Sequence, residues 1–271
     1  IDAAAQVAAA ADVAVVVVGT NADWETEGED RPTMDLPGDQ DALVAAVAKA
    51  NPNTVVVINA GSPVTMPWLD DVAAVMQIWF PGEELGDVLA DVLLGVAEPG
   101  GRLPLTIPAR LEDTPAFAHH PGRDGLAIYG EGLNIGHRWY EAQGIAPVFP
   151  FGHGLGYSTF TIGDLAVDGT TGGATVTATV TNTGARSGSE VVQVYVGAPQ
   201  DGPTRPLRTL QGFTKVTLDA GASTTVTIPL SSRAFAIWDV DAHDWVVPAG
   251  DYTVLVGRSS ADRTEAGTIT A

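Results

Sequence analysis

The hydrophobic residues of this chain follow two different periods, and that change restricts the fold more than any other feature. In the first part, continuous apolar runs at 14–18 (AVVVV), 54–60 (TVVVINA) and 73–80 alternate with helix-like segments at 1–11, 39–50 and 82–95. Uninterrupted apolar runs are typical of strands buried on both faces, and their alternation with helices predicts βαβ units. We therefore expect a mostly parallel sheet with helices on both faces.

The second part of the chain has the period of an antiparallel sheet. From residue 174 onward Thr and Val alternate in short segments, turn residues recur, and no helical pattern is present. This pattern predicts a β-sandwich of about seven strands. Its aromatic residues are scattered singly in the sequence, so we expect a stabilising domain without a platform for stacking sugar rings.

Between these parts the periodicity disappears. Residues 111–158 are rich in Gly, Pro, His and aromatic residues, and such a long irregular stretch in a compact protein usually has a function or wraps another domain. The sequence thus predicts three regions: an α/β sandwich at 1–110, a connecting segment at 111–158 and an all-β sandwich at 159–271.

Composition excludes several classes of function. The net charge is −20 with only 13 Lys and Arg residues, which opposes binding to nucleic acid or to an anionic membrane surface. No apolar run is long enough to cross a bilayer. The absence of cysteine excludes disulfides and zinc–thiolate sites, but it leaves a cytoplasmic and a secreted bacterial location equally open. Because the chain starts at Ile1 inside a predicted helix, we expect it to be a piece of a longer or processed protein.

The strongest candidate site is an acidic loop at residues 20–38, directly after the first buried strand. It contains Trp24, Arg31 and carboxylates at Asp23, Glu25, Glu27, Glu29, Asp30 and Asp35, with Asp39 just beyond it. Ligands of parallel sheets bind beyond the carboxyl ends of the strands, and crowding beside an aromatic ring favours the protonated form of a carboxyl group. One of these side chains is therefore a candidate general acid. Acidic loops are, however, more often only solvated, and residue types alone favour that interpretation by about two to one.

Five motifs in order add a family resemblance. They are the loop GTNADWETEGEDRPTMDLPGDQ, then NPNTVVVINAGSPVTMPW, IWFPGEELGDVLADVLLGVAEPGGRLPLTIP, YGEGLNIGHRWYEAQGIAPVFPFGHGLGYSTF, and the final strands. Over essentially its whole length the chain resembles the C-terminal part of family 3 glycoside hydrolases, the β-glucosidases. The resemblance implies a fibronectin type III-like fold for the second sandwich. It also implies that a (β/α)8 barrel supplies an aspartate nucleophile and that this α/β domain supplies the acid/base glutamate.

The same resemblance assigns roles within the loop. ETEGEDR matches the family pattern E-G-x-D-R and places the general acid/base at Glu27, with Glu25 as the nearest rival. Trp24, Glu25, Asp30 and Arg31 are the expected substrate-binding residues, although Asp30 and Arg31 also suit a structural ion pair.

A retaining glycosidase needs two carboxyl groups about 5 to 5.5 Å apart. We expect one of them here and the other on a barrel, whether in a separate chain or in a missing N-terminal part. This chain alone is therefore expected to be inactive.

The expected substrate is a β-D-glucoside, and no metal or organic cofactor is expected. The five histidines have no metal-ligand spacing: His119, His120, His137, His153 and His243. A β-xylosidase or α-L-arabinofuranosidase of the same family is the nearest alternative, and a non-catalytic carbohydrate-associated module is an alternative from another class. A flavodoxin-like regulatory domain and a serine hydrolase are weaker, since the first loop lacks a phosphoacceptor arrangement and no G-x-S-x-G elbow follows a strand.

Overall fold

A computed structural model describes residues 1–199 and 201–271 of the chain. The chain forms two compact units, and each is described by itself. The first unit comprises residues 1–89 and 107–114, and the second comprises residues 90–106 and 115–271. None of the helices in the described residues has the length and apolar composition needed to cross a membrane.

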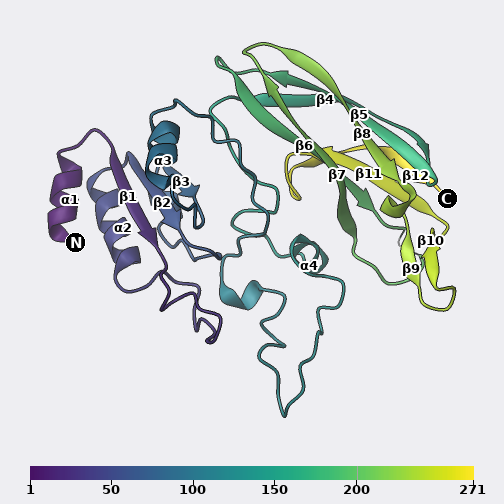
Figure 1. Ribbon diagram of the computed structural model, residues 1–271, viewed down its shortest axis with the longest axis horizontal. Helices are drawn as coiled ribbons and strands as arrows, with labels where there is room; N and C mark the ends of the chain where they lie inside the picture. The colour runs from purple at the N-terminus through teal and green to yellow at the C-terminus, as the bar shows by residue number, and fades with distance from the viewer. Residues whose placement is uncertain (200) are drawn as a thin grey trace. The chain divides into compact units, whose positions relative to one another are not determined.

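The first unit is built on a parallel sheet. Strands β1 (Ala14–Gly19), β2 (Thr54–Asn59) and β3 (Ala74–Gln77) pair in parallel in the order β1-β2-β3. Helix α1 (Asp2–Ala9) packs beside α2 (Gln40–Ala50), and α2 contacts β1 and β2 (Figure 1). A short 3-10 helix, η1, follows at Leu69–Asp71, and α3 (Leu85–Leu93) begins in the first unit and ends in residues assigned to the second. The prediction of a parallel sheet flanked by helices is confirmed.

Burial of the first strand differs from the prediction. In β2, Val56, Val57 and Ile58 are all at most 1% exposed, as expected for a strand covered on both faces. In β1 only alternate residues are buried, while Val15 and Val17 remain 46% and 58% exposed. The physical reason is position: β2 lies between two strands, whereas β1 forms the edge of the sheet within the described residues. The apolar run alone does not distinguish an edge strand from a central one.

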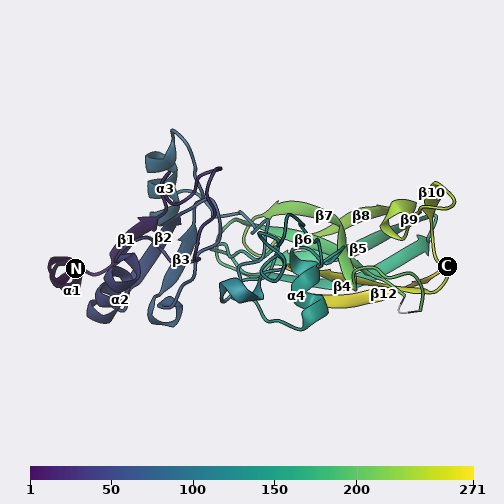
Figure 2. The same cartoon turned by 90° about the horizontal axis from the view of Figure 1, so that it is seen from below.

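The second unit is a sandwich of two antiparallel sheets. One sheet has the order β12-β11-β6-β7 and the other the order β4-β5-β8, and their long strands run in similar directions (Figure 2). The bounds are β4 Phe160–Thr170, β5 Gly173–Asn182, β6 Gly188–Gly197, β7 Arg208–Leu218, β8 Ser223–Ser231, β11 Asp251–Gly257 and β12 Arg263–Thr270. Both sheets contribute alternate residues to one core, including Val180, Val194 and Val254, each fully buried. The predicted β-sandwich is confirmed.

Some elements were missed by the sequence patterns. The pattern AFAIWDV from residue 234 predicted strand β9 (Ile237–Asp239), but its partner β10 (Asp244–Val246) was missed. The hairpin of β9 and β10 brings Trp238 opposite Trp245, with ring centroids 5.5 Å apart. The guanidinium of Arg233 stacks on the Trp245 ring. The aromatic residues are therefore not all scattered singly, because the hairpin register pairs two of them. Strands β4 and β12, the 3-10 helices η2 (Leu111–Asp113) and η3 (Ser232–Ala234), and helix α4 (His137–Gln143) also lay outside the predicted elements.

Helix α4 is tied to the sandwich by one carboxylate. Glu141 accepts hydrogen bonds from Arg208 of β7 and from Arg263 of β12, and the side chains of Glu141 and Arg263 are 15% and 12% exposed. Arg263 also lies over the ring of Tyr195. One anion thus balances two cations from two different strands.

Replacing Glu141 with Gln is expected to lower the free energy of unfolding of the second unit by about 2 to 3 kcal/mol. The substitution leaves two guanidinium groups close together without a counter-charge, one of them largely buried. Chemical denaturation measures the loss. The matched control is Asp262→Asn, which breaks the exposed pair with Arg258 and should cost less than about 1 kcal/mol. Equal losses in both variants would contradict the special role of Glu141.

His137, at the start of α4, makes stability depend on pH. Burial between the rings of Phe151 and Tyr195, together with the cations Arg138 and Arg263 and against the opposing effect of Glu141, lowers the pKa of His137 to about 4. Above pH 6.5 the imidazole is neutral in both the folded and the unfolded state. As the pH falls from 6.5 towards 4, only the unfolded chain takes up the proton, so the free energy of unfolding decreases by at most about 3 kcal/mol. Denaturation curves measured between pH 7 and pH 4.5 should show this decrease in the free energy of unfolding. In His137→Phe the contribution of His137 to the decrease should be absent.

Candidate functional site

The acidic loop is closed at its base by one glutamine. Gln40, the first residue of α2, accepts a hydrogen bond from the Gly19 N–H at 2.7 Å and donates from Nε2 to the Gly19 carbonyl at 2.9 Å. The same amide also donates to the Pro37 carbonyl. The loop therefore leaves β1 and enters α2 at a fixed point. This point lies beyond the carboxyl end of β1, where parallel sheets place their ligands.

Glu25 is held by the next loop of the sheet, which follows β2. Its Oε1 accepts hydrogen bonds from the Thr20 hydroxyl at 2.5 Å and from the Gly61 N–H at 3.1 Å. Its Oε2 accepts a hydrogen bond from the Ser62 hydroxyl at 3.0 Å. The Arg31 guanidinium lies 3.9 Å from Oε1, and the Glu25 side chain is 14% exposed. Both carboxylate oxygens are thus engaged within the chain.

Arg31 also contacts the loop after β2. It donates to the Ser62 hydroxyl at 3.3 Å and to the Pro63 carbonyl at 3.4 Å. Trp24, adjacent to Glu25, is half-buried, and its indole Nε1 is buried without a recorded hydrogen-bond partner. Asp30 is exposed. The structure brings Glu25 and Arg31 together, and the proposed contacts of Trp24, Glu25, Asp30 and Arg31 with a substrate stay predictions.

Glu27 differs from Glu25 in its surroundings. Its side chain is exposed and forms no hydrogen bond or ion pair with any of the described residues. Asp35, further along the loop, accepts a hydrogen bond from the Thr65 hydroxyl at 2.5 Å. Hydrogen bonds from Thr65 and Thr33 hold the pKa of Asp35 below its ordinary value, which keeps this carboxylate ionised and makes it a poor general acid. Of these three carboxyl groups, Glu27 is therefore the one that is exposed and not engaged with another described residue.

Residues of two further loops lie at this edge of the sheet and were not predicted as part of the site. A Cβ on Gly61 would lie 2.6 Å from Glu25 Oε2 and 2.7 Å from the Phe80 ring. Phe80 itself is 56% exposed, and Trp79 before it has a φ of 57°, which is unusual for a bulky residue. From the sequence, Gly61, Trp79 and Phe80 could have been found only by the rule that loops after adjacent parallel strands meet at one edge of the sheet.

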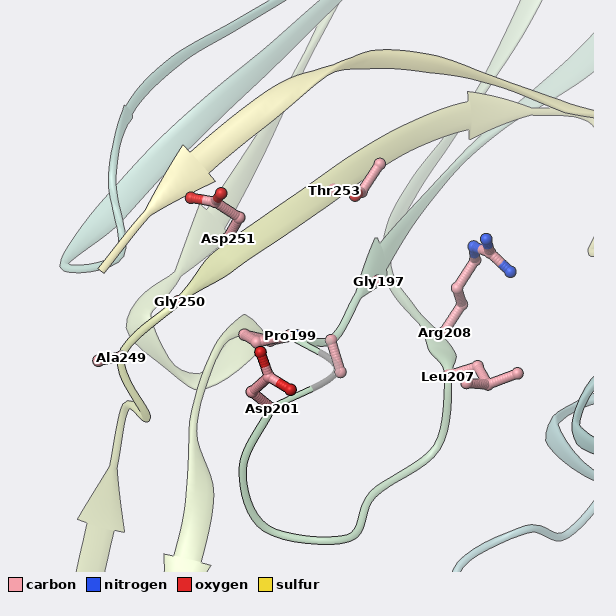
Figure 3. A pocket seen from close by; sticks show the side chains of 10 residues that line it. Gly197, Pro199, Asp201, Leu207, Arg208, Ala249, Gly250, Asp251 and Thr253 are labelled. Atoms are coloured by element: carbon pink, nitrogen blue, oxygen red, sulfur yellow. The ribbon is translucent and has the colours of Figure 1, made fainter.

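A separate hollow lies on the second unit. It encloses about 700 Å³ and is lined by Gly197, Ala198, Pro199, Asp201, Leu207, Arg208, Ala249, Gly250, Asp251 and Thr253 (Figure 3). Arg208 lies on the opposite side of the hollow from Asp201 and Asp251 and is paired with Glu141. Asp251 accepts a hydrogen bond from Thr270. Arg208 and Asp251 are thus engaged within the fold, and we assign no site to this hollow. In the described residues no group of three or more His, Asp or Glu side chains is arranged to hold a metal ion.

Comparison with known families gives a consistent result over most of the chain. Residues 1–157 match the glycosyl hydrolase family 3 C-terminal domain, and residues 190–260 match the fibronectin type III-like domain. The first match includes the acidic loop and the whole parallel sheet. The second covers the middle of the sandwich, from β6 to β11.

Relatives with known names are β-glucosidases. The chain is 46% identical to the β-glucosidase of Rhizobium radiobacter, over 96% of this chain and 32% of the relative, and 42% identical to thermostable β-glucosidase B of Acetivibrio thermocellus, over 97% of this chain and 35% of the relative. The crystal structure of a β-glucosidase from Kluyveromyces marxianus is 43% identical, with a TM-score of 0.94 over 100% of this chain and 32% of that one. DesR, a β-glucosidase from Streptomyces venezuelae in complex with D-glucose, is 40% identical with a TM-score of 0.91, over 100% of this chain and 35% of that one.

The chain thus spans about a third of the length of the curated relatives it matches. Because a family model covers residues 1–157, more than half of the 271 residues, and the fold agrees along the whole chain, the chain belongs to glycoside hydrolase family 3, as its C-terminal domain followed by a fibronectin type III-like domain.

Proposed function

We propose that this chain is the part of a retaining β-glucosidase that supplies the general acid/base, and that Glu27 is that residue. The substrate is a terminal β-D-glucoside, and the nucleophile is an aspartate on a (β/α)8 barrel outside this chain. The relatives named above support the class of substrate, since they are β-glucosidases. The domain division at residues 110 and 158 belongs to the same proposal.

One observation carries the choice of residue. Glu27 is exposed at the carboxyl edge of the sheet with no recorded partner among the described residues, whereas Glu25 accepts three hydrogen bonds and lies beside a cation. A general acid/base must reach the glycosidic oxygen and exchange a proton with it. A carboxyl group whose two oxygens are both engaged within the chain is less free to move to a glycosidic oxygen.

The reaction then has two steps. In the first, protonated Glu27 gives its proton to the glycosidic oxygen while the aspartate of the barrel attacks the anomeric carbon. In the second, the Glu27 carboxylate removes a proton from the water molecule that attacks the glycosyl–enzyme intermediate, and the sugar leaves with its configuration retained. Trp24, Asp30 and Arg31 flank Glu27 in the sequence and are the side chains we assign to substrate binding and to orientation of the loop.

A segment exchange tests the proposal. Residues 1–271 replace the matching third of the Kluyveromyces marxianus β-glucosidase, whose fold agrees closely with this chain. The chimera should hydrolyse p-nitrophenyl β-D-glucoside and release β-glucose first, as nuclear magnetic resonance of the early product shows. A folded chimera that acts on β-xylosides or α-L-arabinofuranosides in preference to glucosides would favour those substrates, and a folded chimera without any glycosidase activity would favour a non-catalytic module.

A further inference from the structure

We infer that Glu25 is a positioning residue whose carboxylate fastens the acidic loop to the loop after β2 and so holds Glu27 in place. This inference rests on the proposed function of Glu27 for its catalytic consequence. We call the contacts of Glu25 with Thr20, Arg31, Gly61 and Ser62 the Glu25 latch. All of these residues lie in the first unit.

The latch fixes the segment that carries Glu27 at both ends. On one side Glu25 accepts hydrogen bonds from Gly61 and Ser62, and on the other side Arg31 donates to Ser62 and Pro63. The stretch 26–30 is therefore a short span whose two ends are attached to the same segment, residues 61–63. A short span closed in this way has far fewer conformations than a free loop. Glu27 lies within this span, so the latch limits where its carboxylate can go.

The atoms packed around Gly61 leave no room for a side chain at this position. A Cβ at Gly61 would lie 2.6 Å from Glu25 Oε2 and 2.7 Å from the Phe80 ring, closer than real Cβ contacts. Any side chain at position 61 would thus push the carboxylate or the ring aside. The Gly61 N–H also points at Glu25 Oε1, so the backbone of this residue provides both the space and one of the donors.

Both oxygens of Glu25 take part in the latch. Gly61 donates a hydrogen bond to Oε1 and Ser62 donates one to Oε2, Thr20 also donates to Oε1, and the Arg31 guanidinium lies 3.9 Å from Oε1. Because donors from two segments of the chain converge on it, this carboxyl group is held in one position and is not free to reach a glycosidic oxygen.

Hydrogen exchange on the 271-residue chain tests the latch without any activity. In Glu25→Ala the Gly61 amide, which donates to Glu25, should exchange about tenfold faster, and the Trp24 amide, which donates to the Asn21 carbonyl, should lose protection with it. Glu25→Gln should fall between wild type and Glu25→Ala, because it keeps the shape and one acceptor. Glu27→Gln and Glu29→Gln are matched controls in the same loop and should leave Gly61 unchanged. Unchanged exchange at Gly61 in folded Glu25→Ala overturns the latch.

Gly61→Ala provides a second variant that alters no carboxylate. Its added methyl group must displace Glu25 or Phe80, so the Trp24 amide, which donates to the Asn21 carbonyl, should again exchange faster. Circular dichroism and the melting temperature identify a variant that fails to fold, in which case Ser62→Ala, which removes only one donor, takes its place. Unchanged loop exchange in both of these variants also overturns the latch.

Kinetics of the chimera separate positioning from catalysis. If Glu25 acts only through Glu27, Glu25→Ala should lower kcat about tenfold on poor leaving groups, Glu25→Gln should recover part of it, and azide should rescue neither. Glu25→Ala should add nothing to a Glu27→Ala background. Azide rescue of Glu25→Ala would make Glu25 the acid/base and overturn the inference. A wild-type chimera without activity would refute the proposed function alone, and the exchange data would still decide on the latch.

Discussion

Glu27→Ala in the chimera should lower kcat/KM by about 10² to 10⁴ for glucosides with poor leaving groups, the range expected on loss of a general acid/base. Such leaving groups cannot depart without a proton on the glycosidic oxygen. Aryl glucosides with good leaving groups depart unprotonated, so their first step should suffer much less. The difference between an alkyl glucoside and a dinitrophenyl glucoside, measured under the same conditions, therefore reports the lost proton transfer directly.

Azide should restore much of the second step in Glu27→Ala. It needs no general base, and it fits into the space that the carboxylate leaves. The product should then be β-glucosyl azide, which thin-layer chromatography or mass spectrometry identifies. Glu29→Ala is the matched control, since Glu29 is an exposed carboxylate two residues further along, and it should show neither the rate loss nor the rescue. Rescue of Glu25→Ala instead of Glu27→Ala would refute the residue assignment while the family assignment remains.

The fold was largely predictable from sequence because its signals are local. The apolar runs that form β1 and β2 are uninterrupted, and the segment of α2 has helical spacing. In the sandwich, β5 has strict alternation of buried residues and becomes a strand of nearly the predicted bounds. These patterns are set by the period of each element and do not need knowledge of its neighbours.

Features that depend on distant contacts were not predictable. The exposure of Val15 follows from the place of β1 at the sheet edge, which its own sequence does not encode. Helix α4 is short and ends at Gly144 in a left-handed conformation, and Glu141 joins it to two strands far away in the sequence. A helix of this kind depends on tertiary contacts more than on its own propensity.

The candidate site also has one feature that was predictable from local sequence and one that depends on distant contacts. The position of the acidic loop after β1 was predictable, because parallel sheets place ligands at that edge. The difference between Glu25 and Glu27 was not, because it arises from Gly61 and Ser62, which lie more than thirty residues further along. Residue types alone do not separate these two carboxylates of ETEG, and only the family pattern E-G-x-D-R favoured Glu27.

The purified 271-residue chain should fold but show no turnover of p-nitrophenyl β-D-glucoside, even with an intact Glu27. Retaining hydrolysis needs a nucleophile about 5 to 5.5 Å from the acid/base, and we assign that nucleophile to a barrel outside this chain. An acid without a nucleophile cannot form the covalent intermediate, so the expected rate of hydrolysis is that of the uncatalysed reaction in buffer.

The measurement compares the chain, at high concentration and with its fold checked by circular dichroism, with an equal amount of the chimera. Glu27→Ala serves as the control for trace contamination, since a contaminating glucosidase would be equally active in both preparations. Turnover by the wild-type chain that disappears in Glu27→Ala would show that a second carboxylate of this chain acts as the nucleophile, and the division of the two catalytic groups between chain and barrel would be wrong.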